Sequence, residues 1–118
     1  MNIWQQQLPQ NTWLVGVNGR LDQTLNPQLE FNLKELLEDG HYHLVVDLSQ
    51  TTYINSGGLR ALVGAWRKAK EHNGNLVLCG LNDRLQEIFS MVGFDKVFQI
   101  YPDTQMAQLA LVGPKLET

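Results

Sequence analysis

The feature that most limits how this chain can fold is a repeated change in the spacing of its apolar residues. In Thr12–Asn18 apolar and polar side chains alternate, and Trp13, Val15 and Val17 share one side, as in a strand with one buried face. In Leu29–Leu37 the leucines recur at helical spacing, as on the buried face of a helix. The two spacings follow each other along the chain, so we expect an α/β fold.

Turn and capping residues divide the chain into expected elements in the order ββαβαβαβα. Asn26 is expected to be the N-cap of the first helix, with Pro27 at its first position and Gly40 just after its end. The expected strands are Met1–Gln7, Thr12–Asn18, Leu44–Leu48, Leu76–Cys79 and Val97–Ile100. Two further helices are expected from about Gly57 to His72 and from Asn82 or Asp83 to Gly93. Pro102 and Asp103 are expected to open a final helix that carries Met106, Leu109 and Ala110.

The connections between these elements predict the architecture. The turn Leu8–Asn11 is too short for a crossover, so the first two strands should pair antiparallel. Strands separated by a helix should pair in parallel through right-handed crossovers. We therefore predict a mixed, mostly parallel sheet of about five strands with about four helices packed on it. The 118 residues have the usual size of one domain and contain no repeat or linker, so we expect a single domain over residues 1–118.

Composition and charge exclude several classes of partner. The formal charge of −3 leaves no basic excess for nucleic acid or for an anionic membrane surface. No apolar run approaches the ~18 residues of a membrane span, and the N-terminal residues lack the features of a secretory signal. The single cysteine, Cys79, lies in an apolar strand and is expected to be a buried thiol. We therefore expect a cytoplasmic protein that does not insert into membranes.

The segment between the third strand and the second helix is the most informative part of the chain. Asp47 interrupts the apolar run Leu44–Leu48, a polar loop is expected after it, and Ser56 stands directly before a helix. The apolar side of this helix is expected to consist of Leu59, Leu62, Val63, Trp66 and Ala69. Serine is a favoured N-cap, because its hydroxyl can accept a backbone N–H of the first turn. The residue types alone therefore predict a capping role for Ser56.

The position of Ser56 also suits a site of modification. In open α/β sheets, ligands are bound at the carboxyl ends of the strands, where Ser56 is expected to lie. Gly57 and Gly58 have no side-chain bulk and would leave it accessible to the active site of another protein. A phosphate would add about −1.5 to −2 charges, which a helix N-terminus tolerates and a buried interface does not. Modification of Ser56 would then abolish binding without unfolding the domain.

Several segments carry a resemblance to a known family. Asp47–Ser49 together with Ile54–Leu59 resembles the signature of the STAS domain, as found in bacterial anti-sigma factor antagonists. Val17–Asp22 resembles the strand-to-loop motif of the same family, and Leu85–Ile100 resembles its C-terminal helix and strand. The likeness extends over nearly the whole chain in the right order, so it implies the STAS fold.

The resemblance also implies a non-enzymatic switch. Such a domain binds an anti-sigma factor, usually a serine kinase that binds the ATP itself, and thereby frees a sigma factor. The kinase would phosphorylate Ser56, a phosphatase would restore it, and the domain would need no cofactor or metal. Family members commonly have an acidic residue before this serine and a second serine after it, where this chain has Asn55 and Gly57. We expect a monomer or weak dimer whose partner-binding surface comprises Asn18, Arg20, Asp22, Asn55, Ser56, Gly57, Gly58, Leu59 and Arg60.

Two enzymatic alternatives use the same polar residues. A serine hydrolase would need the pattern G-x-S-x-G around its nucleophile, whereas Ile54 lies two residues before Ser56. The only histidine that follows, His72, falls near the far end of the same helix, beyond the reach of a triad. Asp22 and Asp47 could form an acid–base or Mg²⁺ site if their loops converge, although ordering of the loop backbone is the expected role of each.

Two further interpretations remain open at this point. His41 and His43 could share one side of a strand, but two histidines without a third ligand make a poor metal site, so a solvated loop or strand edge is expected. STAS-like domains also occur in stress-signalling assemblies and membrane transport complexes, so the chain could be a protein-interaction subunit of one of these. A neighbouring gene for a kinase-like anti-sigma factor would favour the antagonist, and neighbouring transporter genes would favour the alternative.

Overall fold

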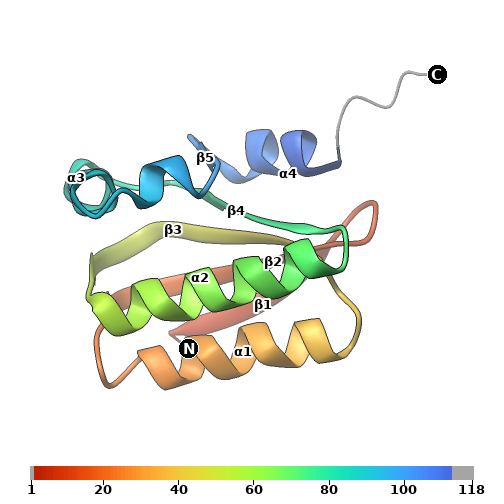
Figure 1. Ribbon diagram of the computed structural model, residues 1–118, viewed down its shortest axis with the longest axis horizontal. Helices are drawn as coiled ribbons and strands as arrows, with labels where there is room; N and C mark the ends of the chain where they lie inside the picture. The colour runs from red at the N-terminus through yellow and green to blue at the C-terminus, as the bar shows by residue number, and fades with distance from the viewer. Residues whose placement is uncertain (1, 113–118) are drawn as a thin grey trace.

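A five-stranded sheet with helices on both faces forms the structure, a computed structural model that describes residues 2–112 (Figure 1). The strands are β1 (Ile3–Leu8), β2 (Thr12–Leu21), β3 (His43–Ile54), β4 (Asn75–Cys79) and β5 (Ile100–Tyr101). The helices are α1 (Asn26–Glu38), α2 (Ser56–Glu71), α3 (Asp83–Met91) and α4 (Thr104–Val112), with a 3₁₀ turn η1 (Phe94–Lys96) before β5. None of the helices described is long and apolar enough to cross a bilayer.

The order of strands in the sheet follows the sequence, β1-β2-β3-β4-β5. β1 pairs antiparallel with β2 across a tight turn in which Gln10 and Asn11 both have a φ angle of 61°. Each later pair is parallel, because the chain returns to the same end of the sheet through a helix. The mixed, mostly parallel sheet predicted from the sequence is confirmed.

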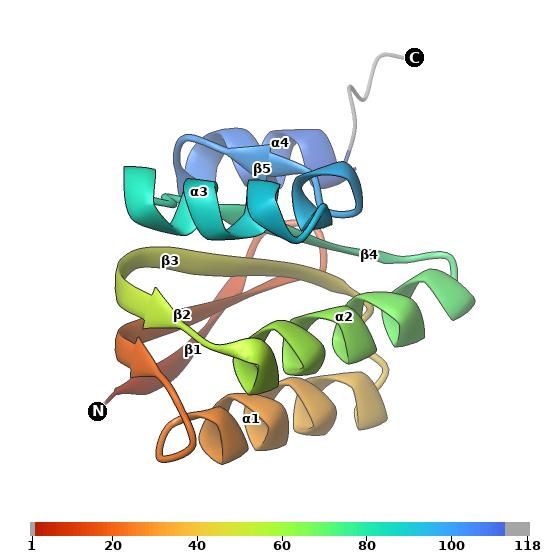
Figure 2. The ribbon, with the colours of Figure 1, turned by 60° about the vertical axis from the view of Figure 1, so that its left-hand side comes forward.

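The helices form two unequal layers on this sheet (Figures 1 and 2). α1, α2 and α3 contribute to the core on one face, and α4 contributes to a smaller core on the other. The larger core contains the predicted stripes of α1 and α2, with Leu29, Leu33, Leu36, Leu37, Leu59, Leu62 and Ala69 buried. In β3, Leu44 and Val46 face the larger core while Val45 faces the smaller one, so this strand is buried on both faces as predicted.

Two strands run further than the sequence predicts, and their extensions shape the region around Ser56. β2 continues to Leu21 and β3 to Ile54, so the segment expected to be a loop is a strand. The two extensions pair in parallel with two shifts of register. Between them, Thr51 is buried and donates its hydroxyl to the Val17 carbonyl at 3.0 Å. Polar strands of this kind form because a neighbouring strand offers hydrogen bonds, which apolar spacing does not reveal.

The C-terminal third also differs from the prediction. η1 occupies Phe94–Lys96, and the last strand, Ile100–Tyr101, begins later than expected. In α4 it is Ala107 that contacts the smaller core, whereas Met106 and Leu109 are 50% and 62% exposed. The final helix itself forms as expected, over Thr104–Val112. Most positions of α4 are apolar, so its sequence does not indicate which side faces the sheet.

Candidate partner-binding site at the start of helix α2

The carboxyl ends of β2, β3 and β4 lie at one edge of the sheet, and α2 begins at this edge (Figure 2). Asn55 alone separates Ile54, the last residue of β3, from Ser56, the first residue of α2. Backbone hydrogen bonds hold the junction, since the Asn55 N–H donates to the Leu21 carbonyl at 3.0 Å. Ser56 is therefore held at the carboxyl edge of the sheet, where the sequence places it.

The N-cap of α2 is Asn55, so the capping role predicted for Ser56 is wrong. Asn55 has extended backbone angles, and its Oδ1 accepts a hydrogen bond from the Gly58 N–H at 3.1 Å. Ser56 is the first residue of α2 itself. Asparagine and serine are about equally good N-caps, so local preference does not choose between two that are adjacent. The end of β3 decides, because it leaves Asn55 in the extended conformation that a cap requires.

This arrangement leaves the hydroxyl of Ser56 without a structural role. Its residue is exposed, and within residues 2–112 its side chain makes no hydrogen bond. It occupies the first position of a helix, where the helix dipole favours an added negative charge. The same position of α3 is held by an acidic residue, Asp83. The fold therefore already carries a negative charge at an equivalent place.

Asn26, expected to cap α1, reaches α2 instead. It is the first residue of α1, whose N-cap is Leu25 with no side-chain hydrogen bond. Its Nδ2 donates to Asn55 Oδ1 at 2.8 Å and so links the starts of the two helices. A Cβ on Gly57 would lie 2.7 Å from Asn26 Nδ2, and one on Gly58 would lie 3.0 Å from Asn26 Oδ1. A side chain at either glycine would displace the Asn26 amide, so the two glycines also serve packing inside the domain, a role that the sequence did not indicate.

A cation and an aromatic ring lie beside this junction. The Arg20 guanidinium, at the end of β2, lies 4.3 Å from the centre of the Tyr53 ring, and its Nε lies 3.7 Å from Asp22 Oδ2. The Arg20 side chain is 61% exposed, so each of these contacts is expected to stabilise the fold by about 1 kcal/mol or less. Their main effect is to fix where the positive charge is presented.

Most of the predicted partner-binding surface is accessible, but part of it is not. Its exposed members are Asn18, Arg20, Ser56 and Arg60, and Asp22, Asn55 and Gly57 are half-buried. Gly58 and Leu59 are buried, and Leu59 packs in the larger core. We call the accessible group around the start of α2 the Ser56 edge, and it consists of Arg20, Tyr53, Asn55, Ser56 and Arg60.

The sequence analysis missed three residues of this region, namely Tyr53, which belongs to the Ser56 edge, and Asn26 and Asn82, which lie near it. Asn82 caps α3, since its Oδ1 accepts the Leu85 N–H at 2.9 Å, and its Nδ2 donates to the Thr51 carbonyl at 3.4 Å. The sequence does indicate Asn82 as a possible start of α3. The Asn26–Asn55, Arg20–Tyr53 and Asn82–Thr51 contacts join distant segments, for which the chain carries no local signal.

The other polar candidates have local structural roles. Asp22 Oδ1 accepts the Thr24 N–H at 3.0 Å, and Asp47 Oδ1 accepts the Ser49 N–H at 2.9 Å, so each carboxylate orders its own backbone as expected. His72 is the C-cap of α2 and therefore lies at the opposite end of this helix from the serine hydroxyl. The geometry of a Ser–His pair is thus absent from this helix.

The remaining titratable groups do not converge on a site. The His41 ring lies 5.0 Å from the Trp13 ring, so it packs on an aromatic side chain. Cys79 is buried in the smaller core, and burial raises the pKa of its thiol to about 11. In the part of the chain that the structure describes, no three His, Cys, Asp or Glu side chains are grouped as a metal site would require.

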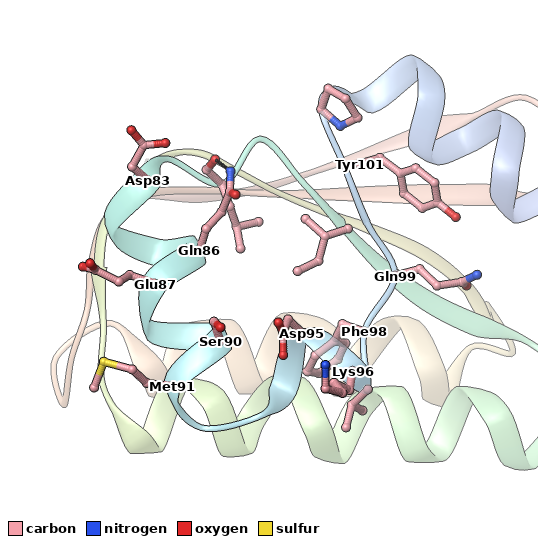
Figure 3. A pocket seen from close by; sticks show the side chains of 14 residues that line it. Asp83, Gln86, Glu87, Ser90, Met91, Asp95, Lys96, Phe98, Gln99 and Tyr101 are labelled. Atoms are coloured by element: carbon pink, nitrogen blue, oxygen red, sulfur yellow. Dashed lines mark hydrogen bonds between the residues drawn. The ribbon is translucent and has the colours of Figure 1, made fainter.

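A large groove lies away from Ser56. Its volume is about 1150 Å³, and it runs between α3 and the η1–β5 segment. In Figure 3 the side chains of Asp83, Glu87 and Met91 point away from the hollow, so its carboxylates do not converge. A groove of about 520 Å³ lies between α1 and α2 and includes Arg60 among acidic and basic neighbours. Of the Ser56 edge, Arg60 lines the second groove, and Arg20, Tyr53, Asn55 and Ser56 line neither of the two.

Comparison with known families agrees with this geometry. Residues 4–107 match the model of the STAS domain. The chain belongs to the STAS-domain family. BtrV of Bordetella bronchiseptica, named as a candidate anti-sigma factor antagonist, is 32% identical over 83 residues, which cover 70% of this chain and 72% of that protein. The anti-sigma-B factor antagonist of Staphylococcus aureus is 28% identical over 92 residues, or 78% of this STAS domain and 85% of that protein.

Solved structures confirm the STAS fold. A candidate anti-sigma factor antagonist from Thermotoga maritima superposes with a TM-score of 0.87 at 17% identity, over 94% of this chain and 95% of that one. SpoIIAA, a cell-fate determinant of Bacillus, is known in its phosphorylated form, which superposes with a TM-score of 0.74 at 14% identity over 94% and 99% of the two chains. Its unphosphorylated form gives the same TM-score of 0.74 at 14% identity, over 93% and 96%.

Proposed function

We propose that this STAS domain is an anti-sigma factor antagonist. It binds an anti-sigma factor of the serine-kinase type through the Ser56 edge and so frees the sigma factor. The kinase, which holds the ATP, phosphorylates Ser56 and ends the complex, and a phosphatase resets the domain. The names of the sequence relatives support this class of partner. We infer that the domain acts as a cytoplasmic binding protein and not as an enzyme.

The observation that carries the proposal is the separation of two roles between adjacent residues. Asn55 provides the cap of α2, and Ser56 provides an exposed hydroxyl that no other part of residues 2–112 uses. A phosphate on Ser56 therefore leaves the cap in place. At the start of a helix the added charge is tolerated, with an effect of roughly 0.3–1 kcal/mol in favour of the fold.

The same charge has the opposite effect at an interface. A phosphate enclosed by the partner without matching groups costs several kcal/mol, and each 1.4 kcal/mol is about a tenfold change in affinity. Phosphorylation is thus expected to remove binding while the domain stays folded. This asymmetry is what a switch between two binding states requires.

The test is to incubate the protein with the purified kinase-type anti-sigma candidate and ATP, and to locate phosphate by mass spectrometry. We expect one phosphate, on Ser56, and none on a Ser56→Ala variant that still binds the candidate. Phosphate on another residue, or none at all, contradicts the proposal. Undiminished binding by phosphorylated protein would instead favour the alternative from the sequence, an interaction subunit of a stress-signalling or membrane transport complex.

A further inference from the structure

The two ends of the Asn55 side-chain amide have different surroundings. Its Oδ1 accepts hydrogen bonds from the Gly58 N–H at 3.1 Å and from Asn26 Nδ2 at 2.8 Å, which together use both lone pairs of the oxygen. Its Nδ2 has no hydrogen-bond acceptor within residues 2–112. It is not enclosed either, because the enclosed and unpaired polar side-chain atoms there are Trp13 Nε1 and Asn26 Oδ1. The N–H₂ group of Asn55, next in sequence to Ser56, is therefore unpaired and not fully enclosed in the half-buried side chain.

The fold imposes this orientation of the amide. The backbone N–H of Gly58 can only donate, so the atom of Asn55 that faces it must be the oxygen. That oxygen requires Asn26 to present its Nδ2, which leaves Asn26 Oδ1 buried without a donor. A buried unpaired acceptor disfavours the folded state. Rotating the Asn26 amide by 180° would place its oxygen next to the Asn55 oxygen, and the two acceptors would repel each other. Asn26 therefore keeps its Nδ2 toward Asn55.

The residues next to Ser56 include donors that no acceptor of residues 2–112 occupies. Asn55, whose Nδ2 is unpaired, directly precedes Ser56. Arg60 is exposed and lies four residues later, on the same side of the helix as Ser56. The first turn of α2 contains no acidic residue. Such a surface complements an oxygen that carries negative charge.

We propose that Asn55 is a specificity-determining residue of the Ser56 edge. With its oxygen held by the cap and by Asn26, it offers an N–H donor and selects a partner that places an anionic oxygen opposite it. This inference rests on the proposed function and names the chemistry of the partner at one position. The oxygen belongs either to a carboxylate side chain of the partner or to a phosphate of the nucleotide that the partner holds.

The test replaces Asn55 by aspartate, a residue of the same shape. Asn55→Asp keeps an oxygen for Gly58 and Asn26 but presents a second oxygen, with charge, where the N–H₂ group was. Aspartate is an equally good N-cap, so the thermal unfolding midpoint should stay the same or rise. Affinity for the kinase-type anti-sigma candidate, measured by isothermal titration calorimetry, should fall about 10- to 100-fold. Titrations without nucleotide, with ADP and with an ATP analogue distinguish a protein carboxylate from a nucleotide phosphate.

Asn82→Asp is the matched control, since Asn82 caps α3 at the same edge of the sheet but uses both ends of its amide inside the domain. It should reduce stability and leave affinity unchanged. Equal or tighter binding by Asn55→Asp, when the unmodified protein binds and is phosphorylated on Ser56, overturns this inference and leaves the proposed function intact. If the unmodified protein neither binds the candidate nor accepts phosphate, the proposed function and this inference are both overturned.

Discussion

Asn55 and Asn82 begin two helices at the same edge of the sheet, and each caps its helix through Oδ1. They differ at the other end of the amide. Asn82 donates its Nδ2 to the Thr51 carbonyl at 3.4 Å, whereas the Nδ2 of Asn55 has no acceptor in residues 2–112. Asn82 thus uses both Oδ1 and Nδ2 for hydrogen bonds within the domain, and Asn55 uses Oδ1 alone. Two N-cap asparagines can therefore differ in whether the side-chain N–H₂ group is available to bind a partner.

The largest effect, on partner binding, is expected when the start of α2 is given the same residues as the start of α3. α3 begins with Asp83 after its cap, so Ser56→Asp gives α2 the same pair of residues. Binding to the anti-sigma candidate should fall by at least about 100-fold, because the interface must enclose a new charge. The free energy of unfolding should change by about 1 kcal/mol or less. Calorimetric titration and urea denaturation measure the two quantities, and a variant that unfolds more easily would show that the two starts are not equivalent.

The second effect is a difference in stability between the two N-cap variants. Asn82→Asp keeps the cap but replaces the donor to the Thr51 carbonyl, 3.4 Å away, by a negative oxygen, so it should destabilise the domain by about 0.5–1.5 kcal/mol. Asn55→Asp should leave the free energy of unfolding unchanged or slightly higher. Urea denaturation of the two variants side by side provides the measurement. Equal losses would mean that the unpaired Nδ2 of Asn55 has a structural role after all.

A smaller effect distinguishes Asn55 from its neighbour. Asn55→Ala removes the cap and should cost about 0.5–2 kcal/mol of stability. Ser56→Ala removes an exposed hydroxyl and should change the free energy of unfolding by no more than about 0.5 kcal/mol. Thermal or chemical unfolding can rank the two variants. The reverse order would restore Ser56 as the cap.

The sequence predicts the fold well because the fold depends on signals that repeat. Apolar spacing indicated the strands in the middle of the sheet and the buried stripes of α1 and α2, and these elements set the topology. The start of α3 could also be predicted, since Asn82 and Asp83 carry a local capping pattern. Ser56 itself was singled out by its place between a buried strand and an amphipathic helix, which needs no knowledge of distant contacts.

The chemistry around Ser56 could not be predicted in the same way. Asn26 and Asn55 are far apart in the chain, and either could cap its own helix, so nothing local indicates that one donates to the other. Gly57 and Gly58 were interpreted as keeping Ser56 accessible, and nothing in the sequence indicated that Asn26 packs against them. Tyr53 was assigned to a loop because its strand is polar and gains its hydrogen bonds from β2. In each case the deciding partner lies in another element.

The last effect concerns pH and appears only in alkaline solution. Cys79 ends β4, the strand that leads to α3, and burial raises the pKa of its thiol from 9.0 to about 11. The unfolded chain therefore loses this proton first as the pH rises. The contribution of the neutral thiol to stability is fully present below pH 9, declines between about pH 9 and 11, and changes no further above that range. Urea denaturation at several pH values should show this decline in the unmodified protein relative to Cys79→Ala, in which the comparison cancels the tyrosines and lysines that titrate in the same range. Parallel curves for the two proteins would mean that the thiol has the same pKa in the folded and unfolded chains. Water would then reach the end of β4 more easily than the burial of Cys79 indicates.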